Sequence, residues 1–382
     1  MFIPRIQLQN LKKLLLPNKV VVLAGARRVG KTTLIKKLIE ELNSKNSLSQ
    51  KILLVNGDDI FERSFLESQS IQKLKDFIGQ NKILIIDEAQ YISQIGLNLK
   101  LIVDHIPDIK IIITGSSSLN IAGEIGEPLT GRKFDLRLFP IAQMELNLIE
   151  NTAQTAANLE NRLIFGSYPE IVITADIELK KRLLKEIVNS FLLKDILQVN
   201  GIKYSNKLIS LLQLLALQIG QTISFNELGA QLGFNRKTIE RYLDLLEKTY
   251  IIYRLQGFSK NLRKEISKNP KYYFWDNGIR NALIANFNPL HLRNDVGALW
   301  KNYIISELLK KDEYGNRMAS FYFWRTYDKQ EIDLIEIFQS EIFAYEIKWT
   351  RQKLKPPAAW QKNYPQSHFN TITPQNYLKF IS

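Results

Sequence analysis

Short runs of β-branched and other apolar residues recur along the first third of the chain and predict buried strands. After these runs come stretches in which apolar positions recur every three to four residues, the helical period. Buried strands that alternate with helices are typical of a parallel sheet covered on both faces. We therefore predict an α/β domain with strands at residues 20–24, 52–55, 83–86 and 110–114.

The middle of the chain is helical by the same criterion. Apolar residues recur every three or four positions throughout residues 180–218. Residues 222–255 then read as a helix, a tight turn at 233–235, a second helix and a strand. Asn235 is a good N-cap for the second helix. This order of elements predicts a winged helix-turn-helix.

Strand patterns return in the last third. Residues 270–283 read as a strand followed by a turn, and residues 295–313 as an amphipathic helix. Residues 320–338 predict a hairpin with its turn near 327–329, and residues 341–349 predict the next strand.

Composition narrows the class of protein. The 382 residues, 45% hydrophobic and 24% charged, are those of an ordinary soluble protein of two to four domains. There is no cysteine and there are only three histidines, which excludes disulfides and thiolate metal sites and argues against a zinc site. The N-terminus has no apolar run long enough for a signal peptide or a membrane span, so we expect a cytoplasmic protein with no membrane partner.

The positive charge is concentrated in one segment. The net charge is +14, and residues 181–265 carry 14 Lys and Arg against 7 Asp and Glu, which is half of the excess. A concentrated basic segment suggests a polyanionic partner, with nucleic acid first. The alternative is a solvated helical surface.

A phosphate-binding motif follows the first predicted strand. The sequence GARRVGKT at residues 25–32 matches G-x-x-x-x-G-K-[ST], between a strand and a helix. In such a loop backbone N–H groups surround the β- and γ-phosphates, the lysine spans them and the threonine binds Mg²⁺. The candidate ATP ligands are Gly25, Ala26, Arg27, Arg28, Val29, Gly30, Lys31, Thr32 and Thr33.

Two acids end the third predicted strand. Asp87 and Glu88 follow four apolar residues, at the strand end where ligands bind in open parallel sheets. We expect Asp87 to hold Mg²⁺ together with Thr32, and Glu88 to polarise the attacking water. A pair of helix N-caps is the alternative, but it does not explain their position after a buried strand.

Polar residues after the fourth strand complete the predicted catalytic set. Thr114 and Ser116 are placed to contact the γ-phosphate or the attacking water. Arg132, beyond that strand, is a candidate arginine finger for a neighbouring subunit's nucleotide. A local salt bridge is the alternative for Arg132, and Arg137 or Arg162 could serve instead.

At this point the motifs GARRVGKTTL, LIIDEAQ, ITGSSSL, LTGR, LFPIAQMEL and FGSYPE together resemble the prokaryotic AAA+ ATPases fused to a C-terminal DUF4143 domain. The resemblance covers nearly the whole chain. It implies an α/β fold with an AAA+ P-loop parallel sheet (1–145), a helical lid (146–215), a winged helix (216–268) and a C-terminal restriction-endonuclease-like, PD-(D/E)xK, domain (269–382).

The last of these domains implies a nuclease-like site. In the PD-(D/E)xK arrangement carboxylates hold Mg²⁺ and a lysine activates water. Asp333, Glu346 and Lys348 fill the strand positions, and Glu307 is available from the helix. The family frequently has Glu where this chain has Lys301, and Glu307 lies 240° round the helix from that position. Both an active nuclease and a DNA-docking or structural use of the fold therefore stay open.

Basic residues lie where the second helix of a winged helix would meet DNA. Arg236, Lys237 and Arg241 lie on its first turns, and the following residues 254–271 carry six Lys and Arg against one acid. We expect contacts mainly to phosphates. Winged helices also serve as protein-binding modules, which is the alternative. The candidate DNA ligands are Arg236, Lys237, Arg241, Lys260, Arg263 and Lys264.

Together these features predict a Mg²⁺-dependent AAA+ ATPase that forms a homo-oligomeric ring, a hexamer, on duplex or branched DNA. ATP hydrolysis would drive translocation, branched-DNA processing or displacement of bound proteins. One alternative is a nucleotide-gated defence or switch ATPase whose C-terminal domain is an active nuclease. Another is a protein-binding ATPase with no DNA role.

Overall fold

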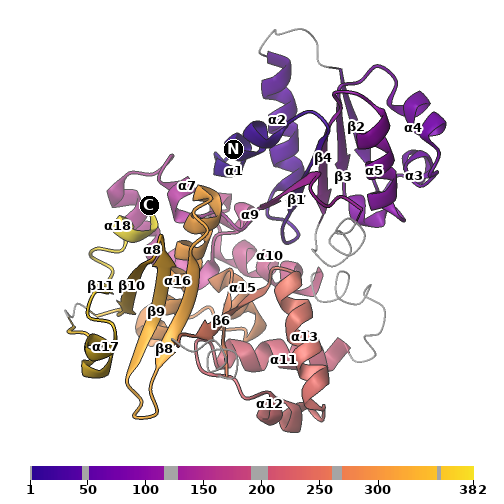
Figure 1. The fold of residues 1–382 in the computed structure, drawn as a ribbon. Coiled ribbons are helices and arrows are strands. Elements are labelled where there is room, and N and C mark those ends of the chain that lie inside the picture. The colour runs from indigo at the N-terminus through magenta and orange to yellow at the C-terminus, as the bar shows by residue number, and fades with distance from the viewer. Residues whose placement is uncertain (1, 45–50, 116–127, 191–204, 260–268, 351–353) are drawn as a thin grey trace. The chain divides into compact units, whose positions relative to one another are not determined.

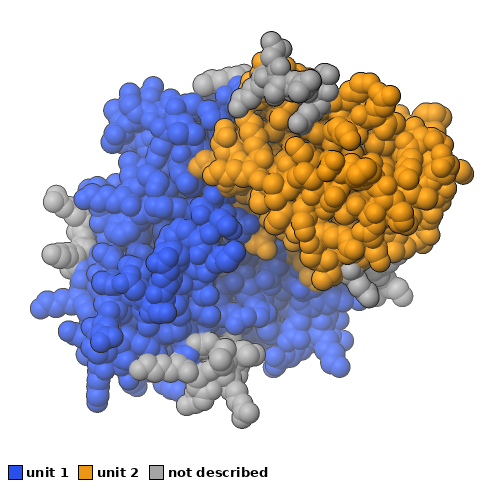
Figure 2. Space-filling model, turned by 45° about the horizontal axis from the view of Figure 1, so that its top comes forward, with its two compact units in different colours: residues 1–4, 140–247, 251–382 blue, residues 5–139, 248–250 orange. Residues whose placement is uncertain are grey.

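A computed structural model describes most of the chain and divides it into two compact units (Figures 1 and 2). The N-terminal unit comprises residues 5–139 and 248–250, and the C-terminal unit comprises residues 1–4, 140–247 and 251–382. The described residues are 2–44, 51–115, 128–190, 205–259, 269–350 and 354–382.

The N-terminal unit is built on a parallel five-stranded sheet in the order β2-β3-β4-β1-β5. The four predicted strands are confirmed, and β5 was not predicted. The first strand, β1, is the topological switch point, because the chain leaves it for the far edge and later returns to its other side. The strands are β1 (Lys19–Ala24), β2 (Ile52–Asn56), β3 (Ile83–Asp87), β4 (Lys110–Gly115) and β5 (Lys133–Arg137).

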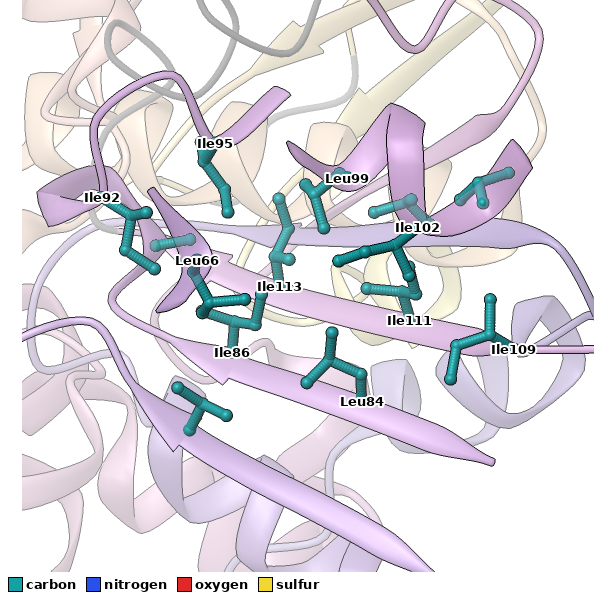
Figure 3. Packing of buried hydrophobic residues seen from close by; sticks show 14 of the residues in the cluster. Leu66, Leu84, Ile86, Ile92, Ile95, Leu99, Ile102, Ile109, Ile111 and Ile113 are labelled. Carbon is teal, nitrogen blue, oxygen red and sulfur yellow. The ribbon is translucent and has the colours of Figure 1, made fainter. Parts of the chain in front are cut away.

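Apolar side chains on one face of this sheet pack against α5 (Ile95–His105). Leu84 of β3 and Ile111 and Ile113 of β4 lie against Leu99 and Ile102 of that helix (Figure 3). All five are fully buried. Because burial of one such side chain contributes about 1.5–3 kcal/mol, this layer fixes the sheet and hence the loops at its carboxyl edge. The other helices of the unit are α1 (Ile6–Leu14), α2 (Lys31–Ser44), α3 (Ile60–Leu66), α4 (Ile71–Ile78) and η1 (Ala89–Tyr91).

The C-terminal unit contains a mixed six-stranded sheet in the order β11-β10-β9-β8-β6-β7. The predicted hairpin is confirmed as the antiparallel pair β8 and β9, and β10 pairs antiparallel with β9. The sheet continues through β6, which pairs with β8 on one side and with β7 on the other. The strands are β6 (Ile252–Gly257), β7 (Lys271–Phe274), β8 (Ser320–Arg325), β9 (Glu331–Phe338), β10 (Glu341–Ile347) and β11 (His368–Ile372).

Two helices of this unit differ from the sequence-based prediction. The turn expected after β7 is the helix α15 (Asn277–Leu283), which Asp276 caps by accepting a 3.1 Å hydrogen bond from the Ile279 amide. The long helix α16 (Val296–Gly315) is not a simple amphipathic helix, since it is buried on several sides. The remaining helices are α7 (Gln143–Leu146), α8 (Thr152–Phe165), α9 (Pro169–Ile173), α10 (Ile177–Ser190), α11 (Ser205–Leu217), α12 (Phe225–Leu232), α13 (Arg236–Lys248), η3 (Leu290–Leu292), α17 (Ala358–Asn363) and α18 (Leu378–Ile381).

The FGSYPE motif contacts the residues around α15 within the C-terminal unit. Gly166 has φ +74°, and a Cβ there would lie 2.0 Å from the Oδ1 atom of Asp276. The same carboxylate accepts a 2.7 Å hydrogen bond from the Ser167 amide. Burial raises the pKa of Asp276. Only glycine allows this approach, so residues 165–170 are tied to the chain around α15.

Candidate functional site

The phosphate-binding motif forms the loop between β1 and α2. The chain turns sharply at Gly25, where a Cβ would lie 2.2 Å from the Leu138 carbonyl oxygen. At the other end of the loop Gly30 has φ +96°. Both positions therefore require glycine. Helix α2 begins at the carboxyl edge of the sheet, and the backbone N–H groups of a helix N-terminus form an anion-binding arrangement.

Lys31 and Thr32 open helix α2. The Lys31 side chain is buried, and its ammonium donates hydrogen bonds to the carbonyl oxygens of Gly25 (2.9 Å) and Ala26 (3.0 Å). The Thr32 hydroxyl donates a 2.7 Å hydrogen bond to Oδ2 of Asp87. The loop thus joins its lysine and threonine to the acid that ends β3.

Thr114 links the two acids. Its buried hydroxyl donates to Oδ1 of Asp87 and accepts a 3.0 Å hydrogen bond from the Glu88 amide. Glu88 has φ +55°, so the chain turns immediately after the strand, and its carboxylate accepts a hydrogen bond from Gln90. Opposite this turn, a Cβ on Gly57 would lie 2.4 Å from the Glu88 carbonyl oxygen. Gly57, which follows β2, and Thr114 of β4 therefore fix the backbone turn that carries the two acids.

Thr32 and Asp87 suit a Mg²⁺ ion. Hydroxyl and carboxylate oxygens are its preferred protein ligands, and Mg²⁺ is commonly held by one or two protein groups plus phosphate oxygens. Both residues lie at the P-loop edge, and the partners described for Asp87 are neutral hydroxyls. The residues present fit the ion.

The other predicted P-loop residues do not share the Asp87 contact of Thr32: two of them have hydrogen-bond partners elsewhere, and two are exposed. Arg27 donates a 2.9 Å hydrogen bond to the Tyr91 hydroxyl, and the Val29 carbonyl accepts one of 2.8 Å from Arg5. Arg28 and Thr33 are exposed. Ser116 lies outside the described residues.

Arg132 lies at the opposite edge of the sheet from its own P-loop. It precedes β5, whose first residue, Lys133, is paired with Val20 at the start of β1. The P-loop follows the end of that six-residue strand, roughly 17 Å away at about 3.3 Å per residue. The Arg132 guanidinium contacts Asp104 at 3.0 Å and is 39% exposed. It is therefore placed away from the nucleotide site of its own chain.

Of the two alternatives, Arg137 belongs to the N-terminal unit and lies at its P-loop edge. It is exposed and pairs with Ala24, the last residue of β1. Arg162 is buried in the C-terminal unit, where it donates to Glu150 and to Gln143. The guanidinium of Arg162 is bound within its own unit.

Asp333, Glu346 and Lys348 come together in the C-terminal unit. Tyr345 lies opposite Leu334 in the β9–β10 ladder, so Glu346 lies beside Asp333 one step further on. The Lys348 ammonium is 2.7 Å from Oε1 of Glu346. Burial and the charge of Asp333 raise the pKa of Glu346. Burial acts to lower the pKa of Lys348, but the hydrogen bond and charge of Glu346 more than offset it, and the pKa is raised.

Lys301 joins this cluster, and Glu307 does not. The Lys301 ammonium donates to Oδ1 of Asp333, whose other oxygen accepts a 2.9 Å hydrogen bond from the Ile347 amide. Glu307 is buried and binds the Lys310 ammonium (2.7 Å) and the Gln143 amide (2.5 Å). The expected acid of the helix is therefore occupied elsewhere, and a lysine takes its place beside Asp333.

The predicted DNA ligands are described only in part. Arg236, Lys237 and Arg241 are exposed on the first turns of α13, and Asn235 caps the helix through the Thr238 amide at 2.8 Å. Arg236 also pairs with Glu240 at 2.7 Å. The other three, Lys260, Arg263 and Lys264, lie outside the described residues.

The same helix also carries an acidic face. Glu240, Asp244 and Glu247 line a pocket of about 330 Å³ together with Arg254 and Tyr272 of the neighbouring strands. Burial and the charge of Glu247 raise the pKa of Tyr272.

Sequence reasoning missed the roles of Gln90, Gly57 and Lys301. Lys301 was noted as a departure from the family pattern, but its partner is 32 residues away and no local spacing points to it. Gly57 directly follows a strand, a position where a glycine signals close approach of another backbone. Gln90 carries no sequence signal of its own.

The loop between β1 and α2 and the acids that end β3 define a P-loop nucleotide-binding unit. Residues 17–147 match the family model of an AAA domain, which covers this unit's sheet and site. Residues 296–370 match a domain of unknown function, DUF4143, and residues 156–290 match a second one, DUF8612. The chain therefore carries an AAA domain followed by a DUF4143 domain, which confirms the predicted resemblance at this level.

Similar proteins occur in bacteria and archaea. An uncharacterised protein of Haemophilus influenzae is 27% identical, over 86% of this chain and 82% of its own. Uncharacterised proteins of Methanocaldococcus jannaschii and Mycobacterium tuberculosis are 26% and 25% identical, over 78% and 87% of this chain and 68% and 70% of theirs.

Solved structures give weaker matches. The replication initiator DnaA bound to AMPPCP and single-stranded DNA has a TM-score of 0.32 and 16% identity, over 64% of this chain and 90% of its own. Drosophila ORC bound to DNA has a TM-score of 0.29 and 11% identity, over 73% and 85%. Within the described ranges no helix combines the length and apolar character needed to cross a bilayer.

Proposed function

We propose that this protein is a Mg²⁺-dependent ATPase that couples ATP hydrolysis to work on DNA. The observation that carries the ATPase assignment is the hydrogen-bonded chain from Thr32 through Asp87 and Thr114 to Glu88. It connects the P-loop helix to the two acids of the neighbouring strand, inside the AAA domain. A purely structural P-loop would not need an acid pair held in this way.

Each residue has a separate task in the proposed reaction. The loop amides and the Lys31 ammonium bind the phosphate oxygens, and the lysine exchanges its present carbonyl partners for them. Thr32 and Asp87 would hold Mg²⁺, which neutralises charge on the phosphates. Glu88 accepts a proton from the attacking water, and Thr114 fixes the turn that aims Glu88.

We propose that DNA is bound through phosphate contacts at the start of α13. Arg236, Lys237 and Arg241 are exposed there, in the segment that carries half of the excess positive charge. The acidic face of the same helix favours a shallow contact over deep insertion into a groove. The winged-helix assignment, with Lys260, Arg263 and Lys264 as further ligands, belongs to this proposal.

Assembly into a ring, a hexamer in the simplest case, is part of the same proposal. Arg132 is separated from its own nucleotide site by the length of β1, so it could act only on the nucleotide of another subunit. Arg137, at the P-loop edge, is the alternative finger.

DNA-stimulated ATP hydrolysis tests this function. We expect duplex, forked or four-way DNA to raise the turnover rate, and binding to weaken as salt rises. Replacement of Arg236, Lys237 and Arg241 by Gln should reduce the slope of log K against log salt by about 3, one per lost phosphate contact. The matched control replaces three exposed lysines of the N-terminal unit by Gln, Lys36, Lys73 and Lys75. A folded wild type that hydrolyses ATP without any response to DNA would contradict the DNA assignment and leave the ATPase intact.

A further inference from the structure

The cluster around Asp333 does not fit the metal that the nuclease resemblance implies. Asp333 is 2% exposed, and both of its carboxylate oxygens already have partners. The Lys301 ammonium lies against Oδ1, and the Ile347 amide donates to Oδ2. A cation at this carboxylate would compete with the ammonium at Oδ1 and share Oδ2 with the strand amide.

The charges of the cluster are balanced without a metal. Asp333 and Glu346 lie side by side on neighbouring strands, and each has a lysine of its own, Lys301 and Lys348. Two carboxylates and two ammonium groups sum to zero. A divalent cation would add two positive charges to a neutral, largely buried cluster, and both lysines would oppose it.

In the part of the chain that the structure describes, no third acidic side chain joins Asp333 and Glu346. Mg²⁺ can be held by one or two protein groups when phosphate oxygens complete its coordination, but Asp333 and Glu346 each already have a lysine as partner. Among the described residues no group of three or more His, Asp or Glu side chains is arranged to hold a metal ion. The third acid that could have contributed, Glu307, is bound to Lys310 and Gln143.

We propose that the Lys301 ammonium takes the place of a divalent cation at Asp333, so that the DUF4143 domain binds no catalytic metal and does not cleave nucleic acid. Asp333 and Glu346 then form a latent cation site, which loss of the Lys301 charge uncovers. Lys301 is the residue that decides between the two states. This inference is independent of the proposed ATPase function, because it concerns the other unit.

Manganese binding without nucleotide tests the proposal directly. The full chain carries Asp87→Asn, to remove the metal ligand of the AAA domain, and free Mn²⁺ is measured by electron paramagnetic resonance. We expect no site tighter than millimolar in this background. Lys301→Glu should gain one Mn²⁺ per chain with at least tenfold higher affinity, and Lys301→Ala a weaker one. Lys301→Arg keeps the positive charge and should gain none.

A second substitution identifies the ligands. Adding Asp333→Asn to Lys301→Glu should abolish the new site. The proposal is overturned if the chain with native Lys301 binds one Mn²⁺ that Asp333→Asn removes. It is also overturned if Lys301→Glu and Lys301→Ala, both folded by circular dichroism, bind none. If neither variant folds, the chain with native Lys301 still decides, since a tight site there contradicts the proposal and its absence agrees with it.

Discussion

Asp87 and Asp333 are two strand carboxylates with opposite surroundings. Asp87 is half-buried at the end of β3, and its described partners are the hydroxyls of Thr32 and Thr114. Asp333 is buried within β9, and its partners are the Lys301 ammonium and a backbone amide. Hydroxyls leave the charge of Asp87 available to a cation, whereas the lysine neutralises that of Asp333. The surroundings of Asp87 thus suit a cation ligand, whereas those of Asp333 suit a buried ion pair.

The largest expected effect is on ATP turnover, which should depend on Asp87 and not on Asp333. Asp87→Asn and Glu88→Gln should each lower kcat for ATP about 100-fold or more, because one loses the cation ligand and the other the base. Asp333→Asn should leave ATP turnover unchanged. Steady-state phosphate release measures all three, with Glu40→Gln on the exposed face of α2 as the control. Equal losses in Asp87→Asn and Asp333→Asn would break the comparison.

The second effect concerns the free energy of unfolding, for which we expect a larger loss at the Asp333 cluster than at the Asp87 site. Lys301→Ala leaves Asp333 buried without its counter-charge and should lower the free energy of unfolding by about 3 kcal/mol. Thr32→Ala removes an exposed hydroxyl and should change it by less than about 0.5 kcal/mol. Urea unfolding provides the values.

A double variant controls for packing at the lysine. Lys301→Met with Asp333→Leu replaces both charges by apolar groups and should recover most of the loss. If Lys301→Ala is as stable as the wild type, the ammonium does not neutralise Asp333.

A third effect isolates the residue that links the acids of the AAA domain. Thr114→Val removes the hydroxyl that binds Asp87 and the Glu88 amide, and should lower kcat about tenfold, which corresponds to roughly 1.4 kcal/mol. Thr114→Ser keeps the hydroxyl and should retain most activity. Normal activity in Thr114→Val with a loss in Thr114→Ser would show that the methyl group, and hence packing, matters instead.

The smallest effect concerns pH at the second cluster. Burial and Asp333 raise the pKa of Glu346, so the folded state binds a proton that the unfolded state has lost. Stability must therefore fall as the pH rises from the unfolded pKa of this carboxyl through its folded pKa. The free energy of unfolding is measured for the wild type and Glu346→Gln from pH 4 upward. We expect similar values at pH 4. Above pH 4 the wild type should lose stability relative to the variant. A constant difference across that range would show that Glu346 titrates normally.

The apolar runs of β1 to β4 were predicted from the sequence, and in β1, β3 and β4 nearly every residue is buried. The β-branched runs of β1, β3 and β4 could only be buried strands, and a strand that ends in Asp-Glu predicts acids at the carboxyl edge. The edge strand β5 was missed because its residues, KFDLR, are mostly charged and only Leu136 is buried. The helix α15 was missed because Asn277-Gly278 reads as a turn, whereas Asp276 caps a helix there.

Pairing between distant residues could not be predicted. Asp333, Glu346 and Lys348 were recognisable as a group, because strand periodicity places Glu346 and Lys348 on one face. The partner of Asp333 comes from α16, whose rotation is set by packing on several sides and not by its sequence pattern. A lysine at position 301 therefore has no visible role until the helix is packed on the sheet.

One assay tests the central claim, that ATP turnover on DNA belongs to the AAA domain and that the DUF4143 domain does not cut. Phosphate release and the integrity of end-labelled forked DNA are followed in the same reaction, with ATP and Mg²⁺, for wild type and Glu88→Gln. We predict that DNA stimulates hydrolysis in the wild type only, while the DNA stays intact in both. DNA cleavage by the wild type, or hydrolysis that survives in Glu88→Gln, would contradict the account.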